Sequence, residues 1–383
     1  MNRRIDEDNK LVYIPAVLPS DSLYNKEFEG YLPSCWNKEK SIWYYPNILL
    51  SAYHGYDIEN IRKIMDIDND VKILYDSGGF QAVTLGGNID PKKVIDLQNK
   101  NADYGLILDR PPYEFGGSAQ FSGTPSKEFF NECLNKTIAN SKIALENKNE
   151  KLELYGVIQG ETWDQMNEWY NGMHQLEINL NKNFDRWALS PKPSYDTNKI
   201  VMLGILTIEN NIKTPIHILQ ISSLSGIMVA SYIRLLTKQL ITIDSSSYSS
   251  GSRYGRIYDN NLKSFDVGDK ASNKNLDSWF CNCPICNKLN INFNKLTEKK
   301  LFQFIDIHNL YQIVEKVKYF DFLVEFDFET FLERAKNISI KCYKSILMLK
   351  FYKENGLEKT KIKYRNIFRN NDKDGKQISI FKF

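Results

Sequence analysis

Short runs of apolar residues alternate with longer amphipathic segments over most of the chain. The apolar runs have the length of β-strands and lie at residues 71–77, 104–109, 152–160, 186–190, 217–222 and 240–246. Segments between them have the apolar spacing of helices, most clearly at 91–101, 125–149, 161–183 and 225–239. This alternation predicts a parallel sheet covered by helices. For a chain of 383 residues, the repeats favour a closed (β/α)8 TIM barrel over an open doubly wound sheet.

Polar side chains end four of these apolar runs. They are Asp76, Asp109, Gln159 and Asp244. A single aspartate in such a place is commonly a turn former or a helix N-cap. The C-terminal ends of barrel strands converge on one face, however, and active sites lie there. Because the four residues belong to four separate strands, we expect them to form a site at that face.

The character of the chain changes after about residue 270, where it becomes rich in Asn and Lys. A cysteine cluster follows, and helices are then expected at 296–317 and 326–337. We expect Phe326, Phe328 and Phe331 to be packing anchors of the second of these helices. The predicted division is a catalytic barrel in 1–270 whose elements continue into the C-terminal part, a zinc-binding subdomain in 271–320 inserted before the C-terminal helices, and a basic helical segment in 321–383 that packs on the barrel.

Composition and charge set limits on the class of protein. Hydrophobic residues make up 42% of the chain and charged residues 25%, which is typical of a globular protein with a large core. The net charge of +3 does not by itself indicate a nucleic-acid partner. No signal peptide and no membrane span are recognisable, and the cysteines are too unevenly placed for a disulfide framework. We therefore expect a cytoplasmic protein, with no membrane partner.

The C-terminal segment carries many basic residues. A solvated helical face and a phosphate-contacting surface both explain them, and the sequence leaves the two open. The residues are Lys341, Lys344, Lys350, Lys353, Lys359, Lys361, Lys363, Arg365 and Arg369.

Three cysteines form a C-x-C-x-x-C cluster at Cys281, Cys283 and Cys286. Three thiolates need one more ligand to complete a tetrahedral zinc site, and His308 is the only histidine downstream. A Cys3His site has no open coordination position. The spacing therefore predicts one structural Zn²⁺, held by these four residues.

Residues 76–81 read DSGGFQ, which is the signature of the tRNA-guanine transglycosylase family. Further segments resemble that family in the same order along the chain. They are LSAYHGY at 50–56, LILDRPPY at 106–113, VIQG at 157–160, ITIDSSSY at 241–248, the cysteine cluster, and HNLY at 308–311. The ordered matches extend from about residue 11 to about residue 318, so the chain resembles this family over most of its length.

The resemblance implies a role for each matched residue. Asp244 is the expected nucleophile at C1′ of the sugar, and Asp76 is the expected general acid and base. A carboxylate stabilises and traps an oxocarbenium-like centre, and a positioned carboxyl moves the proton of the base, so both residue types suit the chemistry. The residues expected to bind the exchanged base are Ser77, Gly78, Gly79, Phe80, Asp109 and Gln159.

Departures from the family pattern bear on the substrate. The family's Pro-Thr-Arg block after the nucleophile is replaced by Tyr248-Ser249-Ser250, although Arg253 and Gly255 are retained. The family's A-I-G-G-L loop reads ALSPK at 188–192, and proline lacks an N–H donor. No appended RNA-binding module is recognisable. These losses point to the DNA-guanine transglycosylases, which place a 7-deazaguanine such as preQ0 into DNA.

The resulting prediction is a pentosyltransferase that exchanges guanine in DNA for a 7-deazaguanine base. Arg253 and Arg256 are candidate phosphate contacts. The Asn- and Lys-rich composition suits an AT-rich genome and the cytoplasm of a bacterial or phage-infected cell. Two alternatives stay open: a divergent enzyme that acts on tRNA, and an inactive relative that only binds nucleic acid.

Overall fold

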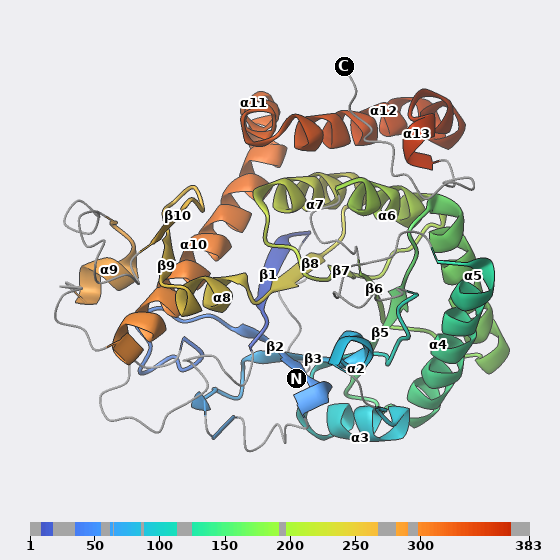
Figure 1. Cartoon of the computed structure of the whole chain (residues 1–383), viewed down its shortest axis with the longest axis horizontal. Coiled ribbons are helices and arrows are strands. Elements are labelled where there is room, and N and C mark those ends of the chain that lie inside the picture. Colours follow the sequence, from blue (N-terminus) through green and yellow to red (C-terminus); the bar gives the residue numbers. More distant parts are fainter. Residues whose placement is uncertain are drawn as a thin grey trace.

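Eight parallel strands form the centre of the molecule (Figure 1). The computed structural model describes residues 9–17, 35–54, 62–63, 65–85, 88–112, 125–190, 197–266, 281–289 and 298–368. The strands are β1 (Leu11–Pro15), β2 (Asn47–Ser51), β3 (Lys72–Asp76), β4 (Tyr104–Leu106), β5 (Glu153–Ile158), β6 (Arg186–Leu189), β7 (Ile216–Ile218) and β8 (Ile241–Ser245).

The sheet closes on itself to form a barrel. Its strand order is β1-β8-β7-β6-β5-β4-β3-β2, so each strand from β2 to β8 pairs with its neighbour in sequence and β1 pairs with β8. A parallel bridge between Ala16 and Leu49 joins the first two strands, and Val17 N–H donates to the Leu49 carbonyl over 3.0 Å. The predicted (β/α)8 barrel is confirmed, and the alternative open sheet is excluded.

Helices surround the barrel and join its strands. They are η1 (Ala52–His54), α2 (Gly79–Leu85), α3 (Pro91–Asn101), α4 (Lys127–Asn147), α5 (Trp163–Leu180), α6 (Thr197–Glu209), α7 (Leu224–Thr237), α8 (Ser247–Arg253), α9 (Pro284–Leu289), α10 (Glu298–Phe326), α11 (Phe328–Ile338), α12 (Ile340–Lys363) and α13 (Arg365–Phe368). The hairpin β9 (Arg256–Tyr258) and β10 (Ser264–Asp266) follows α8.

Several helices begin where the sequence supplies a capping side chain. Ser126, Thr162 and Ser223 each accept a hydrogen bond from a backbone N–H in the first turn of α4, α5 and α7. Asp90 caps α3 in the same way and is followed by a proline at the first helical position. These local signals fix where each helix starts after its strand.

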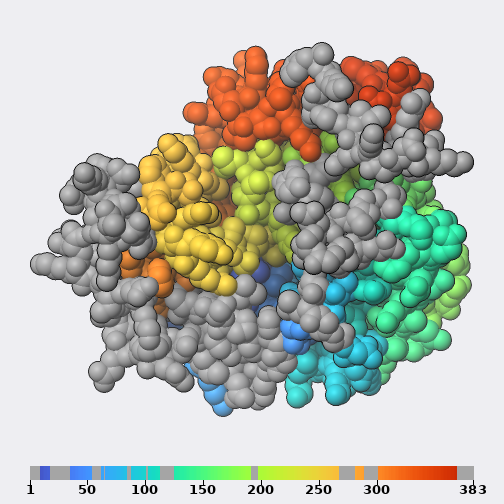
Figure 2. All heavy atoms as spheres, viewed as in Figure 1, coloured from blue at the N-terminus to red at the C-terminus, as the bar shows by residue number. Residues whose placement is uncertain are grey.

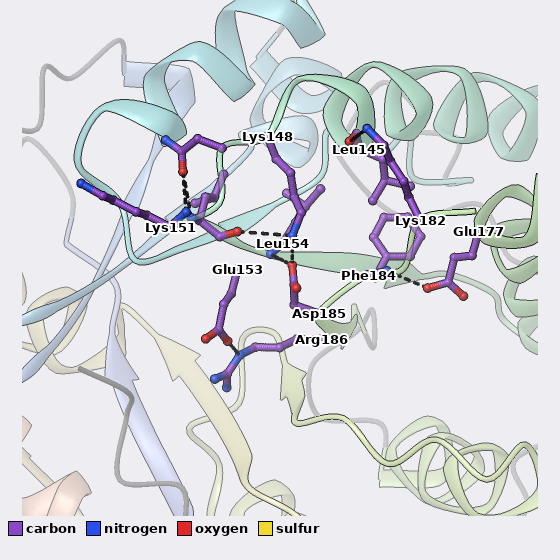
Figure 3. A network of polar contacts seen from close by, with 12 residues as sticks. Leu145, Lys148, Lys151, Glu153, Leu154, Glu177, Lys182, Phe184, Asp185 and Arg186 are labelled. Atoms are coloured by element: carbon purple, nitrogen blue, oxygen red, sulfur yellow. Dashed lines mark hydrogen bonds and ion pairs between the residues drawn. The ribbon is translucent and has the colours of Figure 1, made fainter. Parts of the chain in front are cut away.

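Polar contacts fasten the strand starts at the N-terminal face of the barrel (Figure 3). Asp185 accepts hydrogen bonds from Lys148 Nζ and from the Leu154 N–H, which joins the segment before β6 to β5. Arg186 at the start of β6 pairs with Glu153 at the start of β5. These contacts stabilise the fold, because active sites of such barrels lie at the opposite face.

The long helix α10 packs against α7 and β1, where it covers the junction between the first and last strands (Figure 1). This helix is continuous across residue 320, where a domain boundary was expected from the sequence. The expected division of the chain into domains remains a prediction. Phe331 is fully buried, as expected for a packing anchor. The expectation for Phe326 is wrong: it ends α10 with 70% of its surface exposed. Of the helices that the structure describes, none combines the length and apolarity of a membrane span.

A partly buried ion-pair cluster joins α10 to the barrel. Arg234 of α7 donates through Nε to Asp321 and through Nη1 to Glu325, each over 2.7 Å. Asp321 also accepts a hydrogen bond of 3.2 Å from the N–H of Leu11, the first residue of β1. The pair of Arg234 and Asp321 therefore links α7, α10 and the barrel's first strand.

Replacement of Arg234 by alanine is expected to destabilise the protein by about 3 kcal/mol, because it leaves the carboxylate of Asp321 buried without its cation. Urea unfolding followed by circular dichroism measures this change. Lys318→Ala is the matched control, because Lys318 pairs with Glu315 at the surface and its loss should cost less than about 0.5 kcal/mol. Equal losses of stability in the two variants would contradict a stabilising role for the ion pairs of Arg234.

Candidate active site and metal centre

Three carboxyl groups gather at the C-terminal mouth of the barrel. Asp76 is the last residue of β3, Asp244 lies near the end of β8, and Asp109 follows β4. The negative charge of Asp244 raises the pKa of Asp76, and that of Asp76 raises the pKa of Asp109. The structure thus brings together residues that are far apart in the sequence, at the face where the strand-end pattern predicted a site.

Asp76 has a pKa raised to about 6. Removal from water is the largest cause, and the charge of Asp244 adds to it. Partial compensation comes from the Gly78 N–H, which donates to Oδ2 over 3.2 Å. Ser51 Oγ of the neighbouring strand lies 3.4 Å from the same oxygen. A carboxyl with this pKa exchanges a proton readily near neutral pH, which suits a general acid and base.

Asp109 pairs with the side chain of Gln159, whose Nε2 donates to Oδ2 over 2.6 Å. Removal from water raises the pKa of Asp109 to about 7, and the Gln159 hydrogen bond opposes that rise. Gln159 is buried directly after β5. The pair presents a carboxyl and an amide side by side, which is a donor and acceptor set that fits the edge of a purine.

Asp244 is buried, and one of its oxygens has two polar neighbours. The backbone N–H of Gln220 donates to Oδ1 over 2.9 Å, and His217 Nε2 lies 3.2 Å from the same atom, within ion-pair distance but without a hydrogen bond. Both neighbours come from β7 and the turn after it. Next to Asp244, Tyr13 of β1 donates to the Ser245 carbonyl over 2.7 Å, which fixes the end of β8.

Gly78 and Gly79 make room for the protein's own chain. Gly78 has φ +77°, and a Cβ there would lie 2.6 Å from the Tyr53 Cβ. A Cβ on Gly79 would lie 2.5 Å from the Asp109 carbonyl oxygen. Ser77 is buried and lies 3.4 Å from the Gly79 N–H, so its hydroxyl serves the turn into α2. Phe80, half-buried in the first turn of α2, lies beside this turn.

The stretch after Asp244 presents different residues to the inside and the outside. Tyr248 and Ser249 of α8 are buried, whereas Arg253, Tyr254 and Arg256 are exposed. The Arg256 guanidinium lies 5.6 Å from the centre of the Tyr254 ring. Figure 2 shows the yellow to gold atoms of α8 and the β9–β10 hairpin at the surface beside the barrel. We call the exposed group Arg253, Tyr254 and Arg256 the basic-aromatic patch.

Cys281, Cys283, Cys286 and His308 offer four ligand atoms, all within 4.8 Å of one another. His308 Nδ1 lies 3.4 Å from the sulfur atoms of Cys283 and Cys286. Its Nε2 lies 2.8 Å from the Tyr258 carbonyl, which leaves Nδ1 unprotonated for a metal. The donor set therefore fits one metal ion that would join α9 to α10.

Other sequence-based expectations have mixed outcomes. The basic side chains of α12 are exposed or half-buried, which agrees with both interpretations of that segment. Pro191, Lys192 and Arg369 lie outside the described residues.

His217 and Gln220 were not among the predicted site residues. The polar residues inside the apolar run HILQIS were a signal that this strand carries part of a site.

Together, the fold and this geometry define a (β/α)8 barrel with a carboxyl-lined mouth and a Cys3His centre. No family model and no curated protein matches the chain. Among solved structures, the carboxyl transferase domain of Rhizobium etli pyruvate carboxylase, determined with 3-bromopyruvate, matches at 10% identity and a TM-score of 0.37. That match covers 95% of this chain, which spans 56% of the neighbour's length. At this score the likeness carries no argument about function.

The purified protein is expected to contain one metal ion per chain, and Cys283→Ala should reduce the metal content to well below one. A chelator should lower the thermal midpoint of the wild type, because the ion joins two helices. Elemental analysis and thermal unfolding measure both effects. Cys342→Ala removes a buried thiol away from the cluster and should keep the metal. A metal-free wild type would refute the prediction.

Asp109→Asn is expected to flatten the pH dependence of stability. The wild-type carboxyl has its pKa raised from 3.8 to about 7 in the folded state, so folding favours its protonated form. Stability is therefore lost as pH rises from about 4 through about 7, and the neutral amide avoids that loss. Between pH 4 and pH 8 the wild type should therefore lose about 1–3 kcal/mol more stability than the variant. Parallel pH profiles for the two proteins, measured by urea unfolding, would refute this.

Proposed function

We propose that the protein is a base-exchange transglycosylase that replaces guanine in DNA with a 7-deazaguanine base. One arrangement carries the proposal: Asp244, whose Oδ1 accepts a hydrogen bond from the Gln220 N–H, lies with Asp76 at the same mouth of the barrel, where burial and the charge of Asp244 raise the pKa of Asp76. A fixed carboxylate beside a carboxyl that titrates near neutrality is the pair that base exchange needs. The family resemblance of the DSGGFQ segment supports the same roles.

The reaction consists of two displacements at C1′ of the sugar. Asp244 attacks C1′ through a carboxylate oxygen as the C1′–N9 bond breaks, and Asp76 gives its proton to the departing guanine. Asp76 then accepts the N9 proton of the incoming base, whose nitrogen attacks C1′ and releases Asp244. Two inversions retain the configuration of the sugar. Asp109 and Gln159 bind the edge of each base in turn, and Phe80 offers a stacking face.

DNA is the preferred substrate in this proposal because of the segment after Asp244. Tyr248 and Ser249 stand where the family's tRNA enzymes have Pro-Thr-Arg, and both are buried. The exposed basic-aromatic patch supplies cations, which suit phosphates, and an aromatic ring, which suits stacking with an unstacked base. Neither type of contact depends on the base sequence. A duplex hides C1′, so the guanosine is turned out of the helix before reaction.

The metal in this proposal is Zn²⁺, and its role is structural. Three thiolates and one imidazole are ligands that zinc prefers, and together they leave no open coordination position. The ion would hold α9 against α10 and, through His308, against the Tyr258 carbonyl of β9. No proton or base passes through this site.

The decisive experiment incubates the protein with a radiolabelled 7-deazaguanine base and duplex DNA, single-stranded DNA or tRNA. We expect label in DNA, and no label and no covalent adduct with Asp244→Asn, because an amide cannot displace the base. The control Asp96→Asn changes an exposed aspartate on α3 and should exchange normally. Label in tRNA alone would favour a tRNA enzyme, and label in neither would favour a nucleic-acid-binding protein. An adduct that survives Asp244→Asn would show that the nucleophile is another residue.

A further inference from the structure

His217 is a buried histidine in the interior of the barrel, on β7 and directly below Asp244. No part of its side chain is exposed. Its Nδ1 lies 2.8 Å from Thr242 Oγ1, and its Nε2 lies 3.2 Å from Asp244 Oδ1. Thr242 and Asp244 are both on β8, two residues apart, so they face the same side of the strand. The imidazole therefore bridges two side chains of the strand that carries the nucleophile.

The proton of this imidazole is assigned by its two neighbours. A threonine hydroxyl can donate or accept, whereas a carboxylate only accepts. The contact with Asp244 is favourable only when Nε2 carries a proton, in the neutral ring or in the imidazolium. Thr242 then donates to Nδ1 in the first case and accepts from it in the second. In both states the protonated Nε2 is the atom of the ring that lies 3.2 Å from Asp244 Oδ1.

The hydrogen bond to the same oxygen comes from a strained turn. Gln220 has φ +63°, a conformation that residues other than glycine rarely adopt. This conformation accompanies the orientation of its N–H toward Asp244 Oδ1 at 2.9 Å. Oδ1 thus accepts one hydrogen bond and lies within ion-pair distance of His217 Nε2, whereas no hydrogen bond from the described residues to Oδ2 is found.

We propose that His217 is a positioning residue that, together with the Gln220 N–H, fixes Oδ1 of Asp244 so that Oδ2 attacks C1′. The inference rests on the proposed function and names the attacking atom. An orienting group that holds one oxygen restricts the carboxylate to one rotamer and reduces the loss of entropy at the transition state. A simple packing role is the alternative, since the ring also contacts Tyr155 edge to face with centroids 5.9 Å apart.

Two amide substitutions separate these roles. In His217→Gln the side-chain nitrogen reaches the place of Nε2 and restores the donor to Asp244. In His217→Asn it reaches only the place of Nδ1, toward Thr242. We expect Gln to keep most of the exchange rate, and Asn to lower kcat about 100-fold with little change in the KM for the base. Equal kcat values for the two variants, or a change confined to KM, would overturn the proposal. Thermal unfolding verifies that both variants fold.

A spectroscopic measurement tests the pairing without relying on exchange. With ¹⁵N-labelled histidine, the His217 resonances are assigned by their loss in His217→Gln. We expect Nε2 to carry a proton whose resonance shifts when Asp244 is replaced by alanine. An unprotonated Nε2, or a resonance unaffected by Asp244→Ala, would overturn the proposal whatever the activity. If the pairing is present but the wild type exchanges no base, the proposed function fails instead.

Discussion

Asp76, Asp109 and Asp244 lie at one mouth of the barrel in a place with little access to water, and this loss of hydration constrains the rest of the site. Removal from water is the main reason why the pKa values of Asp76 and Asp109 rise to about 6 and about 7, and the charge of a neighbouring aspartate adds to each rise. The barrel limits the cost by aiming one donor at each carboxylate: the Gly78 N–H, the Gln159 amide and the Gln220 N–H. The pKa of Asp76 that suits proton transfer is a product of this arrangement.

The helix α10 connects the surroundings of Asp244 with the Cys3His cluster. Asn309 donates to the Tyr248 and Arg256 carbonyls and accepts from the Tyr258 N–H, so it holds α8 to β9. One residue earlier, His308 belongs to the Cys3His cluster. The cluster and the placement of the basic-aromatic patch therefore depend on the same turn of one helix.

The sequence predicted the parts of this structure that follow from local patterns. Polar residues at the ends of apolar runs indicated the three strands that carry the carboxyl groups of the site. The C-x-C-x-x-C motif and His308 indicated the candidate metal ligands. The first two strands were missed because LVYIP and NILLS lack flanking helix signals. His217 and Gln220 were missed because their importance depends on the register between β7 and β8, in which His217 lies opposite Thr242. The polar residues of HILQIS mark the strand, but the segment alone does not show which residue of β8 lies opposite them.

The interior of the barrel is more polar than its aliphatic strands suggest. Arg186 lies 4.6 Å from the Tyr104 ring and pairs with Glu153 at the N-terminal face, while Tyr155 contacts both Arg186 and His217. A path of polar and aromatic groups thus leads from Glu153 to Asp244 through the centre. A buried carboxylate needs compensating charge or donors, and the Gln220 N–H and the His217 imidazole lie against Asp244. An aliphatic core would pack as well, yet it would leave Asp244 without the imidazole below it.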